Sequence, residues 1–365
     1  MREPDVAGRL GRLRPRLADA GCDGLLVTHL VNVRYLTGFT GSAGLLLVLP
    51  DDAVLTTDGR YRDQAAEQLA AAEVEARVEV RPTVSGQHDV LADATRGIGR
   101  LGLEADSVTW AQQRRLASAV FADAEMIATE ALVEALRRVK DEGEIERMGE
   151  AARIADEALA AVRPLLGQGV TEREVALGLD YEMRRLGADG SSFETIVASG
   201  PNGAKPHARP TDRRVQPGEL VVIDFGAVVD GYCSDMTRTL CVGEPAEDVL
   251  LRMVATVKES QREGVAAVRA GVRARDVDDT CRTVIADAGW GDAFIHGTGH
   301  GVGLEIHEAP RVASTSDDVL ATGHVVTVEP GVYLAEHGGV RIEDTVVVTD
   351  DGCTVLTNAP KELIV

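Results

Sequence analysis

The chain has 365 residues, more than one ordinary hydrophobic core contains, so its length favours two domains. Lys and Arg number 38 against 59 Asp and Glu, and the resulting formal net charge of −21 disfavours binding to nucleic-acid phosphates. A hydrophobic fraction of 44% indicates packed globular structure. The sequence has no continuous run of about 18 apolar residues, the length that a membrane-spanning helix needs, so we expect no membrane partner.

The N-terminal segment MREPDVAGRLGRLRPRLADAG alternates charged side chains with leucine. It has no apolar stretch followed by a small-residue cleavage site, so it lacks the pattern of a secretory signal. The five cysteines are widely spaced and form no Cys-x-x-Cys pair, which favours free thiols over disulfides or a zinc knuckle. Both observations predict a cytoplasmic protein.

The first third of the chain alternates short apolar runs, which are typical of strands, with segments of helical composition. Strands are expected at residues 24–28, 44–49, 53–57, 74–80 and 101–105, and helices at 60–72, 88–96 and 110–120. This alternation predicts an α/β domain, which we place at residues 1–132.

The second part, residues 133–365, follows a different pattern. A long amphipathic helix is expected first, and Thr171 with Glu174 then forms a capping box that begins another helix. The predicted helices are at 136–161, from 171, at 246–269 and at 274–288, and the strands are at 220–228, 231–240, 325–333 and 340–348. Helices in one set and antiparallel strands in another indicate an α+β domain.

The first segment that carries chemistry is VVIDFGAVVDGYCSDMTRT, in which two apolar strands hold Asp224 and Asp235. A hairpin loop at 229–230 would place the two acids directly opposite, and a loop at 230–231 would place them diagonally on the same face. Like charges on one face repel each other unless a cation or a shared proton lies between them. The alternative is a solvated strand face, which the flanking apolar residues disfavour.

The second segment is VVTVEPGVYLAEHGGVRIEDTVVV. Glu329 and Glu343 lie symmetrically about position 336, so a hairpin that turns at His337 and the two following glycines brings them together. Arg341 and Glu343 alternate along the returning strand and share one face. A polar strand face is again the alternative.

The third segment, HGTGHGVGLEIHEAP, holds His296, His300 and His307 among four glycines. Such glycines let the backbone approach a crowded centre closely. The segment fits neither the GxGxxG dinucleotide motif nor the HExxH zinc motif. Taken singly, each histidine is more often an ordinary hydrogen-bonded side chain.

The three segments together supply four carboxylates and an imidazole. An oxygen-rich set of this kind suits a pair of divalent ions and favours manganese over a lone tetrahedral zinc. Two ions about 3.5 Å apart can share bridging carboxylates and a hydroxide, whose pKa falls toward neutrality. The combination predicts metal-assisted hydrolysis of a carbonyl group without a Ser or Cys nucleophile.

Five segments in the right order resemble the Xaa-Pro peptidase branch (aminopeptidase P and prolidase) of the pita-bread metallopeptidases. They are SGPNGAKPHARPTDR, DFGAVVDGYCSDMTRT, HGTGHGVGLEIHEAP, TVEPG and GGVRIEDT. The resemblance is strong over residues 136–365. It is looser before that, where NVRYLTGFTGS and TDGRYRDQA resemble the creatinase/prolidase N-terminal domain. It implies an α/β domain of that type, followed by an α+β pita-bread catalytic domain.

The resemblance also implies a ligand set for two metal ions. Asp224 would bind the first ion, while Asp235 and Glu343 would bridge both. His300 and Glu329 would complete the coordination of the second ion. Glu329 would also accept the proton of the bridging water, whose hydroxide attacks the substrate.

Around the metals, the resemblance implies a substrate site. His207 and His307 match histidines that contact the scissile peptide and stabilise the tetrahedral intermediate. His296 and Tyr333 match the pocket on the proline side, and Arg341 matches a catalytic arginine beside the bridging glutamate.

The implied activity is that of an Xaa-Pro aminopeptidase or dipeptidase, acting on peptides with proline in the second position. The implied cofactors are two divalent ions, manganese first and cobalt or zinc as alternatives, and the implied assembly is a homodimer. A creatinase-like metal-independent hydrolase and a non-catalytic binding module on the same fold are the alternatives. Both are disfavoured because all five ligand positions carry competent side chains. Whether dipeptides or longer peptides are preferred stays open.

Overall fold

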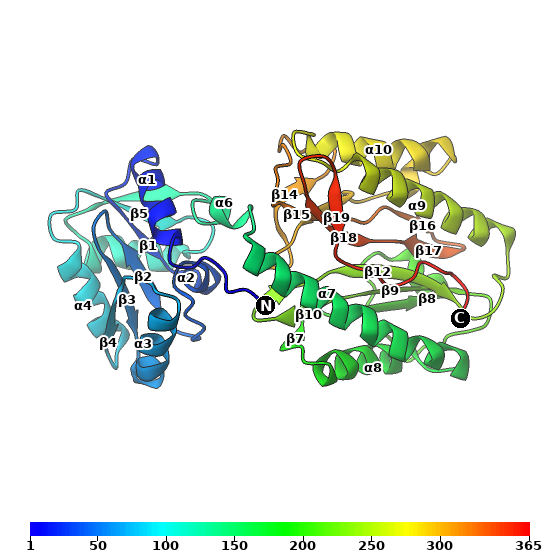
Figure 1. Ribbon diagram of the computed structural model, residues 1–365, viewed down its shortest axis with the longest axis horizontal. Helices are drawn as coiled ribbons and strands as arrows, with labels where there is room; N and C mark the ends of the chain where they lie inside the picture. Colours follow the sequence, from blue (N-terminus) through cyan, green and yellow to red (C-terminus); the bar gives the residue numbers. More distant parts are fainter. The chain divides into compact units, whose positions relative to one another are not determined.

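The computed structural model describes residues 1–365 and divides into two compact units (Figure 1). One unit is Pro4–Arg137, and the other comprises Met1–Glu3 together with Arg138–Val365. The boundary predicted between residues 132 and 133 falls in the turn before α6 (Glu134–Arg137).

The unit Pro4–Arg137 is built on one six-stranded mixed sheet with the strand order β4–β3–β2–β1–β5–β6. The strands are β1 (Gly24–Val27), β2 (Leu45–Val48), β3 (Ala53–Thr57), β4 (Arg77–Val80), β5 (Arg100–Glu104) and β6 (Glu125–Thr129). The other α-helices are α1 (Arg9–Asp19), α2 (Leu30–Thr37), α3 (Arg62–Ala71), α4 (Val84–Ala94) and α5 (Trp110–Arg115). β2 and β3 are antiparallel because a short turn joins them, whereas β3 and β4 are parallel because α3 crosses between them. This confirms the predicted α/β class.

In the second unit, two pairs of helices cover a layer of antiparallel strands (Figure 1). The helices are α7 (Glu142–Val162), α8 (Glu172–Arg185), α9 (Asp248–Ala267) and α10 (Ala274–Asp287). The strands are β7 (Gly190–Ser191), β8 (Ile196–Ser199), β9 (Leu220–Phe225), β10 (Ala227–Val229), β11 (Tyr232–Cys233), β12 (Met236–Cys241), β13 (Gly299–Gly301), β14 (Glu308–Val312), β15 (Val325–Val328), β16 (Gly331–Leu334), β17 (Gly338–Arg341), β18 (Asp344–Val348) and β19 (Cys353–Val355). Every pair of named strands here is antiparallel, which confirms the predicted α+β class.

The helix boundaries in this unit follow from their caps. Thr171 and Glu174 form the predicted capping box at the start of α8. The single helix predicted over 136–161 is instead two helices, α6 and α7. The reason is that Asp141 and Glu144 form a second capping box, which begins α7 at Glu142.

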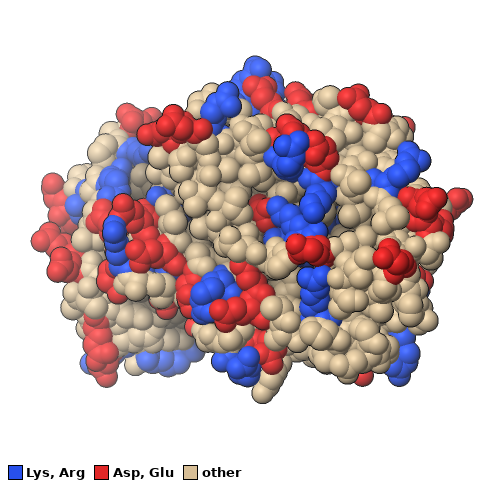
Figure 2. Space-filling model, turned by 45° about the vertical axis from the view of Figure 1, so that its right-hand side comes forward, with Lys and Arg blue, Asp and Glu red and all other residues tan.

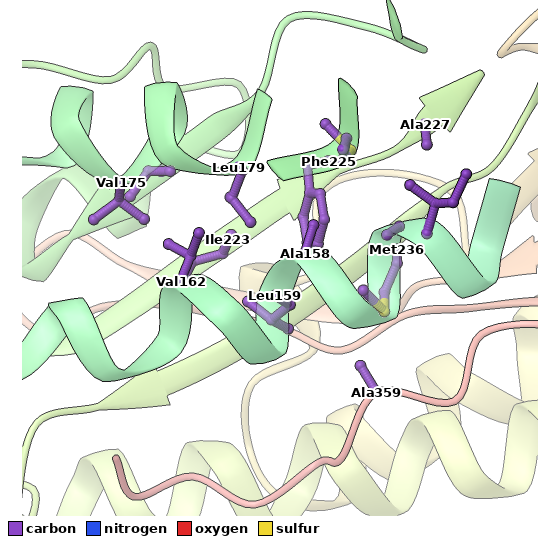
Figure 3. Packing of buried hydrophobic residues seen from close by; sticks show 14 of the residues in the cluster. Ala158, Leu159, Val162, Val175, Leu179, Ile223, Phe225, Ala227, Met236 and Ala359 are labelled. Atoms are coloured by element: carbon purple, nitrogen blue, oxygen red, sulfur yellow. The ribbon is translucent and has the colours of Figure 1, made fainter. Parts of the chain in front are cut away.

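The apolar core beneath α7 and α8 determines which side chains of β9 point away from it (Figure 3). Leu159 of α7 and Leu179 of α8 are buried in one apolar cluster with Phe225 of β9. Ile223 belongs to the same cluster, and burying a side chain of this size contributes about 1.5–3 kcal/mol. Successive residues of a strand point to opposite faces, so Ile223 and Phe225 in the core direct Asp224 to the other face.

The surface carries both signs of charge. Acidic and basic side chains are interspersed over the face drawn in Figure 2, and neither kind covers it continuously. None of the helices combines the length and the apolar character that crossing a lipid bilayer requires.

Candidate metal centre

The first acidic hairpin adopts one of the two registers considered from the sequence. Asp230 and Gly231 form its turn with φ of 45° and 73°, the left-handed conformation that a tight two-residue hairpin loop needs. β9 then pairs with β12 so that Asp224 lies opposite Thr237. Asp224 and Asp235 are therefore diagonal neighbours on one face, the arrangement expected for a loop at 230–231.

The second hairpin confirms the predicted symmetry. Val328 pairs with Asp344, and Gly331 pairs with Arg341, so both registers are centred on position 336. Glu329 directly follows β15 and Glu343 directly precedes β18, which brings the two glutamates face to face.

The predicted turn at His337 and its two glycines is wrong in detail, because the turn comprises residues 335–337 and the glycines begin β17. A Cβ at Gly338 would lie 2.5 Å from the carbonyl oxygen of Gly200, and one at Gly339 would lie 2.0 Å from that of Gly203. These glycines therefore allow two backbones to pack closely, and Gly338, with φ of 97°, also closes the turn in the left-handed conformation.

The side chains predicted as metal ligands lie close together where the two hairpins meet the segment of His300. Potential ligand atoms of Asp235, His300 and Glu343 all lie within 4.8 Å of one another. The Nε2 atom of His300 is 3.5 Å from Asp235 Oδ2 and 3.4 Å from Glu329 Oε1. Asp224 Oδ1 and Glu343 Oε1 are buried and have no hydrogen-bond partner. Buried carboxylate oxygens without a partner are costly, so these two atoms are suited to bind a cation.

Burial and mutual repulsion both disfavour the ionised forms of the acids in the centre. Burial raises the pKa of Asp235 and of Glu343 well above the usual range of a carboxyl group, and neighbouring carboxylates add to the effect. Burial also raises the pKa of Glu329 to about 8, with Arg341 opposing the shift and the charge of Asp224 adding to it. Divalent cations at this place would relieve the repulsion.

His300 has the protonation state that a metal ligand needs. Burial lowers its pKa to about 4, so the ring is neutral near pH 7. Its Nδ1 atom lies 3.0 Å from the carbonyl oxygen of Gly301. Nδ1 therefore carries the proton, and the lone pair of Nε2 faces the carboxylates. Two acceptors that face each other in this way fit a cation between them, and carboxylates with an imidazole suit manganese, cobalt or zinc.

Three of the predicted substrate residues form one hydrogen-bonded line that ends on Asp224. Arg341 donates from Nη2 to Asp224 Oδ2 at 2.6 Å and from Nη1 to the Tyr333 hydroxyl at 2.8 Å. The Tyr333 hydroxyl lies 2.8 Å from His296 Nε2. Burial lowers the pKa of His296 to about 4, so the neutral ring accepts the hydroxyl proton. These hydrogen bonds connect His296 and Tyr333 to the acidic cluster.

The remaining two predicted residues lie on the solvent side. The ring of His307 meets that of His300 edge-on, with centroids 4.4 Å apart. Partial burial and the nearby charge of Arg311 lower the pKa of His307. His207 is exposed in a loop next to Pro206, whose carbonyl oxygen accepts a hydrogen bond from Arg341 Nη1 at 3.3 Å.

Two threonines that the sequence pattern did not single out support the ligands. The Thr237 hydroxyl donates to Glu343 Oε2 at 2.7 Å, and the Thr327 hydroxyl lies 3.2 Å from Glu329 Oε1. Thr237 follows Asp235 by two residues and Thr327 precedes Glu329 by two. The alternation of a strand, which puts such pairs on one face, is the signal that could have found them.

Comparison with known proteins places this site in a family. The model of metallopeptidase family M24 matches residues 146–350, and the model of the creatinase/prolidase N-terminal domain matches residues 9–139. The chain is 36% identical over 358 residues to the Xaa-Pro dipeptidase of Pyrococcus furiosus, covering 98% of this chain and 99% of that protein.

Solved structures agree over nearly the whole length. The Xaa-Pro dipeptidase from Bacillus anthracis matches with a TM-score of 0.94 and 42% identity, covering 99% of this chain and 100% of that one. The X-Pro aminopeptidase from Thermotoga maritima matches with a TM-score of 0.86 and 37% identity, covering 96% of this chain and 99% of that one.

The predicted fold class, a creatinase/prolidase-type α/β domain followed by an α+β pita-bread domain, is confirmed by these matches. The prediction of an enzyme with divalent metal ions agrees with the family and with the cluster of Asp235, His300 and Glu343. The chain therefore belongs to metallopeptidase family M24 and is a metallopeptidase with a creatinase/prolidase N-terminal domain.

Proposed function

We propose that this chain is a dinuclear metal-dependent exopeptidase that hydrolyses the peptide bond between an N-terminal residue and proline. The observation that carries the proposal is the convergence of Asp235, His300 and Glu343 within 4.8 Å. The proline specificity is supported by relatives that carry the names Xaa-Pro dipeptidase and X-Pro aminopeptidase.

We assign the ligands as the family resemblance implies. Asp224 would hold one ion, Asp235 and Glu343 would hold both, and His300 with Glu329 would hold the second. Two divalent ions in such a site would polarise the scissile carbonyl and lower the pKa of a water molecule between them, so that hydroxide forms near neutral pH. Glu329, beside His300 and the Thr327 hydroxyl, would take up the proton of that water.

The surrounding residues would bind and orient the peptide. His207 and His307 are exposed and could donate hydrogen bonds to the oxyanion of the tetrahedral intermediate. Tyr333, held between Arg341 and His296, would form the wall for the proline ring. A bond to proline has no N–H, so the site needs no acceptor for that nitrogen. The acidic cluster would attract the free α-ammonium group of the substrate.

A peptidase assay on chelator-treated protein tests the proposal. An Xaa-Pro dipeptide, an Xaa-Pro tripeptide and a Met-initiated peptide without proline are compared after Mn²⁺, Co²⁺ or Zn²⁺ is added back. We expect metal-dependent cleavage of the Xaa-Pro bond, with the peptide without proline cleaved at least about 100-fold more slowly. Preference for the dipeptide would make the chain a dipeptidase, and preference for the tripeptide an aminopeptidase.

Undiminished cleavage by metal-free protein would refute the dinuclear mechanism, and dominant cleavage of the Met-initiated peptide would refute the proline specificity. Manganese as the native metal, the homodimer and the cytoplasmic location stay predictions. Metal analysis of protein purified from its source cells and sedimentation of the purified chain would test the first two.

A further inference from the structure

We propose that Glu172 is a positioning residue, which holds the loop that carries His207 over the metal centre. The inference rests on the proposed function, because it concerns the role assigned to His207. Glu172 is the first residue of α8 and has no exposed surface. A buried carboxylate persists only where hydrogen bonds or a cation compensate for lost hydration, so its partners indicate its purpose.

Those partners are the two ends of one loop. Glu172 Oε1 accepts hydrogen bonds from the Ser199 backbone N–H at 2.7 Å and from the Ser199 hydroxyl at 2.8 Å. Oε2 accepts from the Thr211 backbone N–H at 3.0 Å and from the Thr211 hydroxyl at 2.6 Å. The Asn202 amide nitrogen lies 3.1 Å from both oxygens. The lone pairs of both oxygens are thereby used.

The same contacts keep the carboxylate charged. Burial raises the pKa of Glu172, but hydrogen bonds from Thr211, Ser199 and Asn202 outweigh it and lower the pKa below the ordinary value. An ionised acceptor forms stronger hydrogen bonds than a neutral one. Glu172 therefore ties the loop ends more firmly than a neutral side chain could.

The loop between these ends reaches the centre. It comprises η4 (Gly200–Ala204) and residues 205–210, which include His207. A Cβ at Gly203 would lie 3.0 Å from the Gly339 backbone nitrogen, so η4 packs directly on β17. Pro206 is joined to Arg341 by a hydrogen bond. Lys205, His207 and Arg209 themselves are exposed.

An exposed side chain on a free loop samples many positions, and its help in catalysis falls when orientation is lost. Closing the loop at its base restricts these positions before the substrate arrives. Replacing Glu172 by glutamine keeps the shape of the side chain, but it turns one oxygen into an N–H donor that faces other donors. The base of the loop would loosen, while the ligands of the metal centre would keep their own contacts.

A double-mutant cycle tests the proposal. Glu172→Gln is made in the wild-type protein and in His207→Ala, and kcat/KM is measured on an Xaa-Pro dipeptide with saturating Mn²⁺. We expect Glu172→Gln to lower kcat/KM about 10-fold or more in the wild-type protein and less than about twofold in His207→Ala. Mn²⁺ binding, followed by calorimetry, should stay within about twofold of wild type.

Glu174→Gln is the matched control. It removes the same charge from the same helical turn, but Glu174 is exposed and accepts hydrogen bonds from Thr171 alone. We expect its kcat/KM to stay within about twofold of wild type. Thr211→Val removes one donor to Glu172 from an exposed position. It should lower kcat/KM about threefold, again only where His207 is present, and it keeps the test valid if Glu172→Gln fails to fold.

Equal losses in the presence and absence of His207, or no loss from Glu172→Gln and Thr211→Val, would overturn the positioning role. Full activity of His207→Ala alone would instead contradict the function proposed for His207, and the role of Glu172 would fall with it. A protein that binds Mn²⁺ but cleaves no Xaa-Pro peptide would contradict the proposed function itself.

Discussion

Single residues at the metal centre follow a simple rule, which is that an acid on an otherwise apolar strand faces away from the core. The rule predicts Asp224, Asp235, Glu329 and Glu343 from the sequence, because each stands in or beside a strand whose neighbours are buried. It cannot predict that Arg341 donates to Asp224. That contact depends on how two separate hairpins pack, which alternation within one strand does not encode.

Removing one carboxylate from the centre should have opposite effects on function and on the stability of the metal-free protein. Glu343→Gln removes a buried charge that Asp235 and Glu329 repel. In chelator-treated protein we therefore expect the free energy of unfolding to rise by about 1 kcal/mol or more. Metal-dependent stabilisation should be lost and kcat/KM should fall by at least about 1,000-fold.

Thermal unfolding with and without Mn²⁺ measures the two effects on stability, and an assay on an Xaa-Pro dipeptide measures kcat/KM. Glu336→Gln is the matched control, because it removes the same charge from the exposed turn of the same hairpin and should leave both quantities unchanged. Retention of wild-type Mn²⁺ affinity by Glu343→Gln would contradict the assigned ligand set.

His324 should make stability depend on pH. Its ring is buried, Nδ1 accepts the Ala321 backbone N–H at 3.2 Å, and burial with the nearby charges of Arg138 and Lys140 lowers its pKa to about 4. The unfolded chain takes up this proton near pH 6.5 and the folded chain does not. Stability from this residue is therefore full above pH 6.5 and is lost as pH falls toward 4, by at most about 3 kcal/mol.

Urea unfolding from pH 7 to pH 4.5 tests this dependence as the difference between wild type and His324→Asn, in which the side-chain oxygen can replace Nδ1 as acceptor. The difference in unfolding free energy should change by about 1–3 kcal/mol across this range. Parallel curves for the two proteins would show that His324 does not titrate as its surroundings indicate.

At the scale of elements, regular strands and capped helices were predictable and irregular ones were not. β3 and the capping box of α8 agree with the prediction. α1 was not predicted, although Leu10, Leu13 and Leu17 form a buried stripe, because Pro15 and the arginines between them obscure its helical character. β13 was missed because its glycines have low strand propensity. Tertiary packing decides such segments.

The packing of α9 on α10 depends on Gly264. A Cβ at this position would lie 2.3 Å from the Cys281 sulfur and 2.9 Å from a methyl group of Val328. Gly264→Ala should therefore destabilise the protein by about 1–3 kcal/mol, although alanine is the better helix former. Gly149→Ala in α7, where the added methyl group meets nothing within 4 Å, should stabilise it by up to about 1 kcal/mol.

Urea unfolding of both variants gives the comparison. Because the two substitutions are chemically identical, any general effect of alanine on the unfolded chain cancels between them. Equal stabilisation of both variants would mean that α9 and α10 move apart to accommodate the added methyl group without any loss in the free energy of unfolding.

At the scale of the whole molecule, the chain combines a unit that holds all the predicted ligands with one that holds none. The residue pattern predicts two classes of domain from the change in periodicity. It says nothing of whether their stabilities are coupled, because coupling depends on contacts between residues far apart in the sequence.

Metal binding should therefore protect the two units unequally. A ligand stabilises the structure that binds it by about 2.7 kcal/mol at 100 times its dissociation constant, and this stabilisation slows the exchange of amides that open with that structure. We expect Mn²⁺ to slow hydrogen exchange in β9 and β15 by up to about 100-fold. Exchange in β1 and β5 of the unit Pro4–Arg137 should not change.

Glu343→Gln should abolish the difference between the two units, which separates metal binding from general effects of the salt. Equal slowing in both units would show instead that they open as one cooperative structure, and the metal centre would then stabilise the entire chain.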